Sequence, residues 1–284
     1  GSGASAQLNM TFLGNYPYTP DLSDIWGHVD SLGNEYAIVG VQNGISVVDV
    51  TTPSSPSEVY FIPGPNTIWR DIKVWDKHAY VTNESSGGMK IIDLSNLPDP
   101  TFPTVATYSG SSYPFTKAHD LFIDENGVAY IIGSNYSNGG AIMLDLTADP
   151  MNPTELGVFD NYYLHDAMVR GDTLWGGAID DGFFVAVDVS NKAVPIVLAT
   201  QNTPNNFTHN CRISDDGNTL FTTDETSGAF IASYDVSDIS NIAELDRIQS
   251  NPGSGTIPHN TFFMNDFVIT SYYKDGITVH DVTR

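Results

Sequence analysis

A short pattern, an aspartate followed by Val or Leu and then by Ser or Thr, recurs six times at the end of an apolar run. Its aspartates are Asp49, Asp93, Asp145, Asp188, Asp235 and Asp281, and successive ones lie 43 to 52 residues apart. This period is typical of arrays of small four-stranded sheets and exceeds that of most helical solenoids. Because an Asp followed by Ser or Thr is ordinary turn chemistry at a strand end, we assign these aspartates no catalytic role.

The best-defined unit spans residues 118–159 and contains four short apolar runs bounded by Asn, Gly, Asp or Pro. We expect strands at residues 121–124, 128–133, 141–145 and 155–159. Six such units predict an all-β fold, a six-bladed β-propeller of four-stranded antiparallel blades, in a single domain over residues 1–284. The units begin near residues 28, 70, 118, 165, 209 and 259, and no helix of useful length is visible.

The sixth unit stops after its third strand at residues 276–281, so its fourth strand must come from elsewhere. Residues 10–16, MTFLGNY, resemble the fourth-strand sequences ELGVF and TVATY. We therefore expect residues 10–16 to complete the last blade and to close the ring, which would remove exposed sheet edges. The first four residues, GSGA, have the composition of a cloning remnant.

The charge balance excludes two classes of partner. With 34 acidic and 11 basic residues, the formal net charge is −23, and both nucleic acids and anionic membranes require basic patches. No apolar run approaches the length of a membrane span. A single cysteine, Cys211, excludes an internal disulfide framework. We expect a monomer that neither binds nucleic acid nor inserts into a membrane.

Histidines recur near the start of the units, usually directly before Asp or Asn. Five of the seven occupy what we interpret as one equivalent position: His28, His119, His165, His209 and His259. The first strand of each blade is the innermost, so these positions should converge on the central channel.

Two interpretations of this ring remain open. Imidazoles with neighbouring carboxylates or amides suit a divalent metal ion, zinc, copper or iron if the histidines are the ligands. Calcium is the alternative if Asp120, Asp166 and Glu84 supply the ligands. In the other interpretation, the His-Asp and His-Asn pairs tie each blade to its neighbour through hydrogen bonds, with no ion present.

The second strands add polar residues at one side of the expected pocket. Glu84, Asp224, Glu225, Tyr272 and Tyr273 follow three of these strands, whereas the other three end in glycines. Such asymmetry suits a ligand site, and the glycines would leave open space. Glu84, Glu225 and Tyr272 are the candidate catalytic residues, as metal ligands or as general acid and base. Turn or surface roles explain either glutamate alone equally well.

The second unit carries Arg70 where the other units carry histidine. Its permanent charge suits either a clamp for a ligand carboxylate or an internal ion pair, and the many nearby acids favour the pair. Aromatic residues precede the first strands and would form a rim for sugar rings or other planar ligands. The candidate ligand-binding residues are Arg70, Trp26, Trp69, Tyr163 and Phe207. Packing between blades is the alternative role for these aromatics.

The repeats resemble a known family. The segments GISVVDVTTPSSPSEV, GMKIIDLSNLPDP and GITVHDV resemble the LVIVD repeat. The ordered segments WRDIKV, HAYVTNES, AHDLFID, TTDETSGA and PHNTFF resemble the choice-of-anchor B family of exported bacterial proteins over nearly the whole chain. The resemblance implies an extracellular or cell-surface propeller followed by a C-terminal anchor. Since this chain ends after the sixth unit, we expect that the anchor is missing from it.

Two classes of function follow. The favoured one is an extracellular binding module whose central pocket, with or without a metal ion, holds a glycan, a small molecule or a surface protein. The alternative is a metal-dependent hydrolase, lyase or oxygenase that keeps a coordination position open for water or substrate. Nothing in the sequence resembles a nucleophile elbow, a phosphate-binding glycine loop or a zinc-protease helix.

Overall fold

A computed structural model describes residues 11–283 of the chain. The expected cloning remnant at residues 1–4 and the first residue of the expected closing strand, Met10, lie outside the described part. Within it, the one helical element is a single 3-10 turn at Ile239–Asn241, and none has the length and apolar character that a membrane span requires.

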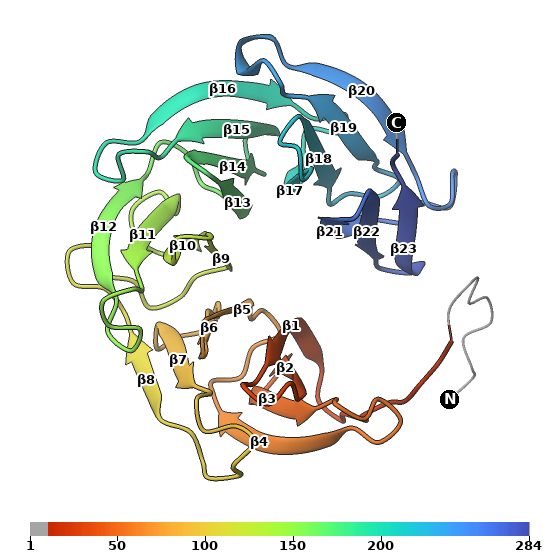
Figure 1. Cartoon of the computed structure of the whole chain (residues 1–284). Coiled ribbons are helices and arrows are strands. Elements are labelled where there is room, and N and C mark those ends of the chain that lie inside the picture. The colour runs from red at the N-terminus through yellow and green to blue at the C-terminus, as the bar shows by residue number, and fades with distance from the viewer. Residues whose placement is uncertain (1–10, 284) are drawn as a thin grey trace.

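The six predicted sheets are present and form a ring, with the first strand of each innermost and the last outermost (Figure 1). Every neighbouring pair of strands within a sheet is antiparallel, which confirms the six-bladed propeller.

The first three blades have four strands each. They are β1 (Leu22–Val29), β2 (Glu35–Val41), β3 (Gly44–Asp49) and β4 (Ser57–Pro63); β5 (Ile72–Trp75), β6 (His78–Val81), β7 (Met89–Asp93) and β8 (Val105–Tyr108); β9 (Asp120–Ile123), β10 (Val128–Ile132), β11 (Ala141–Asp145) and β12 (Thr154–Phe159).

The next two blades also have four strands, and the sixth has three. They are β13 (Asp166–Arg170), β14 (Thr173–Ala178), β15 (Phe183–Asp188) and β16 (Ile196–Asn202); β17 (Thr208–Ile213), β18 (Thr219–Asp224), β19 (Ile231–Asp235) and β20 (Ala243–Ile248); β21 (Pro258–Met264), β22 (Phe267–Tyr272) and β23 (Gly276–Asp281).

The hydrophobic core lies between the blades. In blades 1 to 5 the second and third strands are largely buried on both faces, which suits continuous apolar runs such as VAYII and AIMLD. Five core clusters each join two consecutive blades, from blades 1 and 2 through to blades 5 and 6. Among the described residues, no such cluster joins blade 6 to blade 1.

The repeated aspartates form turns, as expected. In blade 1 the side chain of Asp49 accepts the backbone N–H of Thr51 at 2.9 Å, and in blade 3 that of Asp145 accepts the N–H of Thr147 at 2.8 Å. Each of these contacts fixes the chain direction directly after the third strand of a blade.

The N-terminal segment, residues 11–16, packs against blade 1. Its contact resembles that of a fourth strand with the blade that follows it in the ring. A Cβ atom on Gly157, in β12, would lie 1.8 Å from the carbonyl oxygen of Lys192 in blade 4. A Cβ atom on Gly14 would lie 2.0 Å from the carbonyl oxygen of Pro53, at the matching position of blade 1. Both glycines therefore allow a close backbone approach that any side chain would block.

The predicted closing strand is not formed in the described residues, because residues 11–16 adopt no strand and blade 6 retains three strands. A gap separates β23 from the first strands of blade 1 (Figure 1). The segment keeps its packing contact with blade 1 and pairs with no edge of blade 6. The edge strand β23 consequently exposes Ile277 and Val279.

Candidate functional site

A belt of hydrogen bonds joins the innermost strands near the channel axis. The side chain of Asp71 accepts the N–H of Leu121 in the next blade at 3.1 Å, and Asp120 accepts that of Ala167 at 3.1 Å. Asn210 likewise accepts the N–H of Thr261 at 3.1 Å. In these three doublets, each a His or Arg followed by Asp or Asn at the start of a blade, the Asp or Asn therefore ties its blade to the neighbouring one, as the structural interpretation predicted.

The same belt shows that His28 was assigned to the wrong position. In blade 1 it is Asp24 that accepts the N–H of Ile72, at 2.8 Å. Ser23 and Asp24 are thus the equivalents of a His-Asp doublet, and His28 lies at the opposite end of β1. Buried beside Tyr36, at 6.2 Å between ring centroids, His28 belongs to neither donor group found among the described residues. Blade 1 therefore starts at Leu22, earlier than the expected start near residue 28.

The remaining four predicted histidines converge. His119 and His165 directly precede β9 and β13, whereas His209 and His259 lie within β17 and β21. Successive ring centroids are 3.9, 4.3 and 4.4 Å apart. We call these four residues, from four consecutive blades, the histidine arc.

The arc contains two overlapping sets of donor atoms. One comprises His119, His165 and His209, and the other comprises His209, Glu225 and His259. Within each set, one nitrogen or carboxylate oxygen per residue lies within 4.8 Å of the others. Both sets suit a first-row transition metal by donor type.

Glu84 anchors one end of the arc. Its carboxylate is hydrogen-bonded to Nδ1 of His119, and this hydrogen bond lowers the pKa of Glu84. Burial opposes the charged form of His119, but the hydrogen bond and the charge of Glu84 together raise its pKa. The contact fixes the orientation of the His119 ring.

The rest of the arc is neutral. Burial lowers the pKa of His165 to about 3, and it also lowers the pKa of His209 and of His259. His209 is 1% exposed, and both of its ring nitrogens are buried without a hydrogen-bond partner. A neutral imidazole always carries one N–H, so a buried donor is left unsatisfied, at a cost of about 1–3 kcal/mol.

Glu225 lies at the other end of the arc, as the sequence suggested. Its carboxylate oxygens are 3.4 Å from Nε2 of His209 and 3.8 Å from Nε2 of His259. The hydroxyl of Tyr273 donates a hydrogen bond to the same carboxylate. Two imidazoles and one phenol thus surround this acid.

Tyr272, a predicted catalytic candidate, lies away from the arc, and its neighbour Tyr273 takes the place expected of it. Tyr272 is 2% exposed and packs with Phe221 and Val268 between blades 5 and 6. Successive residues of β22 point to opposite sides, so the next residue, Tyr273, reaches Glu225 and lines the cavity described below. The two adjacent tyrosines gave no signal in the sequence to distinguish them.

Arg70 lines the cavity described below but forms no ion pair among the described residues. Its guanidinium donates hydrogen bonds to backbone carbonyls, including that of Val41 at 3.0 Å, and so holds the end of β2. Of the acids that it was expected to pair with, Asp71, Asp120 or Glu84, the first binds Nζ of Lys73 through both oxygens, at 2.7 and 2.8 Å. On the opposite side of the ring, Nη1 of Arg212 lies 3.5 Å from Asp166. Neither Lys73 nor Arg212, which occupy equivalent positions of β5 and β17, was predicted from the sequence.

A cavity of about 690 Å³ adjoins the arc, and residues of blades 1, 2 and 6 also line it. Its wall includes His119, His209 and His259 together with Asp71, Asp120 and Asp166. Burial raises the pKa of Asp71 and of Asp120. The wall is therefore rich in acids and imidazoles.

The predicted aromatic rim is only partly present around this cavity. Trp69 lines it and is 54% exposed. Trp26 packs against Phe262, with 6.1 Å between ring centroids, and so joins blades 1 and 6 near the axis. Tyr163 lies against Gly133 behind His119, and Phe207 is partly exposed in the loop before β17; neither lines the cavity.

The glycines of the second strands do not leave open space. A Cβ atom on Gly133 would lie 2.8 Å from Cβ of His119, and one on Gly177 would lie 2.8 Å from the carbonyl oxygen of His209. These glycines allow the histidine-bearing strands to pack closely. Their role is to position the arc.

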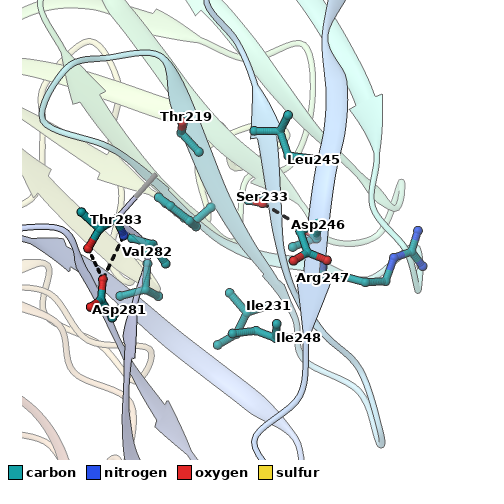
Figure 2. Close-up of a pocket in the computed structure, with 13 residues that line it drawn as sticks. Thr219, Ile231, Ser233, Leu245, Asp246, Arg247, Ile248, Asp281, Val282 and Thr283 are labelled. Carbon is teal, nitrogen blue, oxygen red and sulfur yellow. Dashed lines mark hydrogen bonds between the residues drawn. The ribbon is translucent and has the colours of Figure 1, made fainter.

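A second, smaller cavity of about 320 Å³ lies between the outer strands of blades 5 and 6 (Figure 2). Its wall is formed by Ile231, Ile248 and Val282 with the side chains of Asp246 and Arg247. Asp246 on β20 is opposite Ser233, just as Gly157 on β12 is opposite Met143, so Asp246 and Gly157 occupy equivalent positions of blades 5 and 3. At Gly157 a loop of the following blade packs against the outer strand, whereas at Asp246 the cavity occupies that place. Its lining includes no histidine and neither of the donor sets found among the described residues.

Comparison with known proteins identifies the repeat. Residues 30–61, 69–106 and 178–203 match the LVIVD repeat, which is associated with β-propellers. No curated protein matches the chain significantly.

Several solved structures share the fold. The β-propeller domain of Cps50 (Swd1) from Myceliophteria thermophila is 12% identical with a TM-score of 0.64, covering 95% of this chain and 85% of that one. A putative 6-phosphogluconolactonase from Bacteroides uniformis is 12% identical with a TM-score of 0.66, covering 89% and 79%. Virginiamycin B lyase from Staphylococcus aureus is 13% identical with a TM-score of 0.63, covering 93% and 82%. At such low identity these similarities establish the fold alone.

Proposed function

We propose that this chain is a metal-dependent binding module. One divalent transition-metal ion binds to the histidine arc, and a glycan, a small molecule or a surface protein binds in the adjoining cavity. The observation that carries this proposal is the convergence of four imidazoles from four blades, three of which are neutral. Neutral imidazole is the form that ligates metals.

The unsatisfied nitrogens of His209 support an ion in place of a purely structural network. The belt of acids and amides already joins the blades, so the histidines are not needed for that purpose. Bound metal would provide a partner for a ring nitrogen that has no hydrogen bond. The acids around the cavity would in turn favour a dication.

A metal-dependent hydrolase, lyase or oxygenase is the second candidate. It is favoured by the Glu225–Tyr273 contact, which places a carboxylate beside the arc and a phenol in the cavity wall. These are groups that can hold or transfer a proton. Virginiamycin B lyase, an enzyme, has a similar fold, although the similarity to this chain is one of fold alone.

An extracellular or cell-surface location is part of this proposal. A large negative charge suits a protein surrounded by solvent, and the LVIVD repeat matches three segments of the chain. Export is tested by fractionating cells that express the natural gene and locating the protein with an antibody. Recovery only from the cytoplasm would contradict the proposed location.

The metal is tested by titrating the purified, chelator-treated protein with Zn²⁺, Co²⁺ and Ca²⁺ in a calorimeter. We expect one equivalent of Zn²⁺ or Co²⁺ to bind, and replacement of His209 by Ala to weaken binding by at least 100-fold, because His209 belongs to both donor sets.

The matched control is His28→Ala, which removes a buried histidine outside the arc and should leave metal affinity unchanged. Absence of Zn²⁺ and Co²⁺ binding to the folded protein would contradict the proposed function. Binding without turnover of ester, glycan and lactone panels would favour the module over the enzyme.

A further inference from the structure

The two overlapping donor sets of the arc share His209, so a single ion must lie nearer to one of them. We infer that the ion lies at the Glu225 end, bound by His209, His259 and Glu225. This inference rests on the proposed function and specifies the ligands, the coordination and the class of metal at that site.

The separations between Glu225 and the two histidines suit an ion at this end. Two ligands of a tetrahedral metal ion with bonds of about 2.0–2.1 Å lie about 3.3 Å apart. The carboxylate of Glu225 is 3.4 Å from Nε2 of His209 and 3.8 Å from Nε2 of His259. Both distances exceed the 2.7–3.2 Å of an ordinary N–H···O hydrogen bond. Oε2 of Glu225 is the oxygen near His209, and Oε1 is the one near His259, so each imidazole lies beside one carboxylate oxygen. One donor atom from each of the three residues lies within 4.8 Å of the other two, which leaves room for an ion between them.

Charge favours the same end. A dication bound by three neutral imidazoles keeps its full charge in a buried site, whereas a carboxylate ligand cancels half of it. Glu225 supplies this carboxylate, and His209, which is 1% exposed, has no other partner for its Nε2 atom. In the other set, the carboxylate of Glu84 is already bound to Nδ1 of His119.

Tyr273, whose ring also lies 5.4 Å from that of His259, and the backbone hold Glu225 in place. The hydroxyl of Tyr273 donates to the carboxylate, and the N–H of Glu225 donates to the carbonyl of Phe207 at 3.2 Å. Metal-ligating carboxylates are typically fixed by such outer contacts. The side chains of His259 and Glu225 are 35% and 21% exposed, and His209 and His259 line the cavity, so a ligand in the cavity can reach the ion.

Two histidines and one carboxylate with open positions form the ligand set that binds ferrous iron in oxygen-using enzymes, and it also binds Mn²⁺, Co²⁺ and Zn²⁺. The structure therefore assigns to the cavity a ligand that coordinates the metal through oxygen. His119 and His165 lie beside this position along the arc and are available to hydrogen-bond the bound oxygen.

A matched pair of variants tests the placement. His119 and His259 occupy equivalent positions of blades 3 and 6, and each belongs to only one donor set. We expect His259→Ala and Glu225→Gln to weaken Co²⁺ and Fe²⁺ affinity at least 100-fold, and His119→Ala to weaken it less than 10-fold. Affinities are measured calorimetrically under anaerobic conditions, with circular dichroism and the melting temperature confirming that each variant is folded.

A reversed pattern, with affinity lost in His119→Ala and kept in His259→Ala, would place the ion at the three-histidine set and overturn the inference. Equal losses in both variants would overturn it as well, because they would show an ion shared by the whole arc. In either case the proposed function survives. Failure of the unaltered protein to bind Zn²⁺, Co²⁺ or Fe²⁺ would overturn both.

Discussion

At the scale of single residues, the two adjacent residues of a repeated doublet have different roles. In the doublet His119-Asp120 the histidine joins the arc, and the aspartate accepts the N–H of Ala167 in the next blade. Alternation along a strand explains the division, because adjacent side chains point to opposite sides. The metal-binding and the structural interpretations of the sequence are therefore compatible, because the histidine and the aspartate of one doublet fulfil separate roles.

Asp120 offers a test of the structural half. We expect Asp120→Ala to lower the free energy of unfolding by about 1–3 kcal/mol, because the buried N–H of Ala167 loses its acceptor. Asp120→Asn should cost less, since Asn210 makes the equivalent hydrogen bond in blade 5. Urea denaturation measures both. Equal stability of the alanine variant and the unaltered protein would contradict the belt.

The sequence predicted which residue types would converge, and four of the five histidines do. It did not show the register within blade 1, where Ser23-Asp24 replaces the doublet and His28 misled. It also did not show which of Tyr272 and Tyr273 faces the cavity, because that depends on where β22 ends. A shift of one residue in strand register changes which side chain faces the cavity, and it is decided by tertiary packing and not by the local sequence.

At the scale of elements, loops are held to the blades by side chains that accept several backbone N–H groups. Glu155 of β12 accepts the N–H groups of Ser111 and Ser112, both at 2.8 Å, and that of Tyr113 at 3.1 Å. Burial opposes its charge, but these hydrogen bonds lower the pKa of Glu155 to about 2. One carboxylate thus ties the loop after β8 to the neighbouring blade.

Glu155 gives a pH-dependent prediction. Because its pKa is lower in the folded state, its contribution is present above the ordinary pKa of about 4.5 and is lost as the pH falls from there toward 2. We expect Glu155→Gln to destabilise the protein by about 1–2 kcal/mol at pH 7 and by clearly less at pH 3.5.

The matched control for this prediction is Glu244→Gln on β20, which removes an exposed ion pair with Arg247 and should cost less than about 0.5 kcal/mol. Urea midpoints at the two pH values measure the difference. A Glu155→Gln effect of equal size at both would show that the carboxylate charge plays no part.

At the scale of the whole molecule, six sheets were predictable because turn residues and apolar runs repeat with a regular period. The seam between blades 6 and 1 was predicted less well. Residues 11–16 carry a fourth-strand sequence and approach blade 1 as such a strand would, yet they form no ladder with β23. At this seam Oδ1 of Asn260, the last member of the belt, is buried without a partner.

The packing of the N-terminal segment is tested by a matched pair of glycines. We expect Gly14→Ala and Gly157→Ala each to destabilise the protein by about 1–3 kcal/mol, because the added methyl group would meet a carbonyl oxygen of the following blade in both cases. Thermal denaturation measures the two variants side by side. A neutral Gly14→Ala variant beside a destabilised Gly157→Ala variant would show that the N-terminal segment contributes nothing to the ring.

The central claim is that the histidine arc binds a metal ion, and anomalous X-ray diffraction from crystals grown with Zn²⁺ tests it most directly. The account predicts one strong anomalous peak at the arc, about 2.0–2.1 Å from Nε2 of His209 and at bonding distance from His259 and Glu225. A map with no peak at the arc, from crystals in which Zn²⁺ is present in excess, would contradict the account.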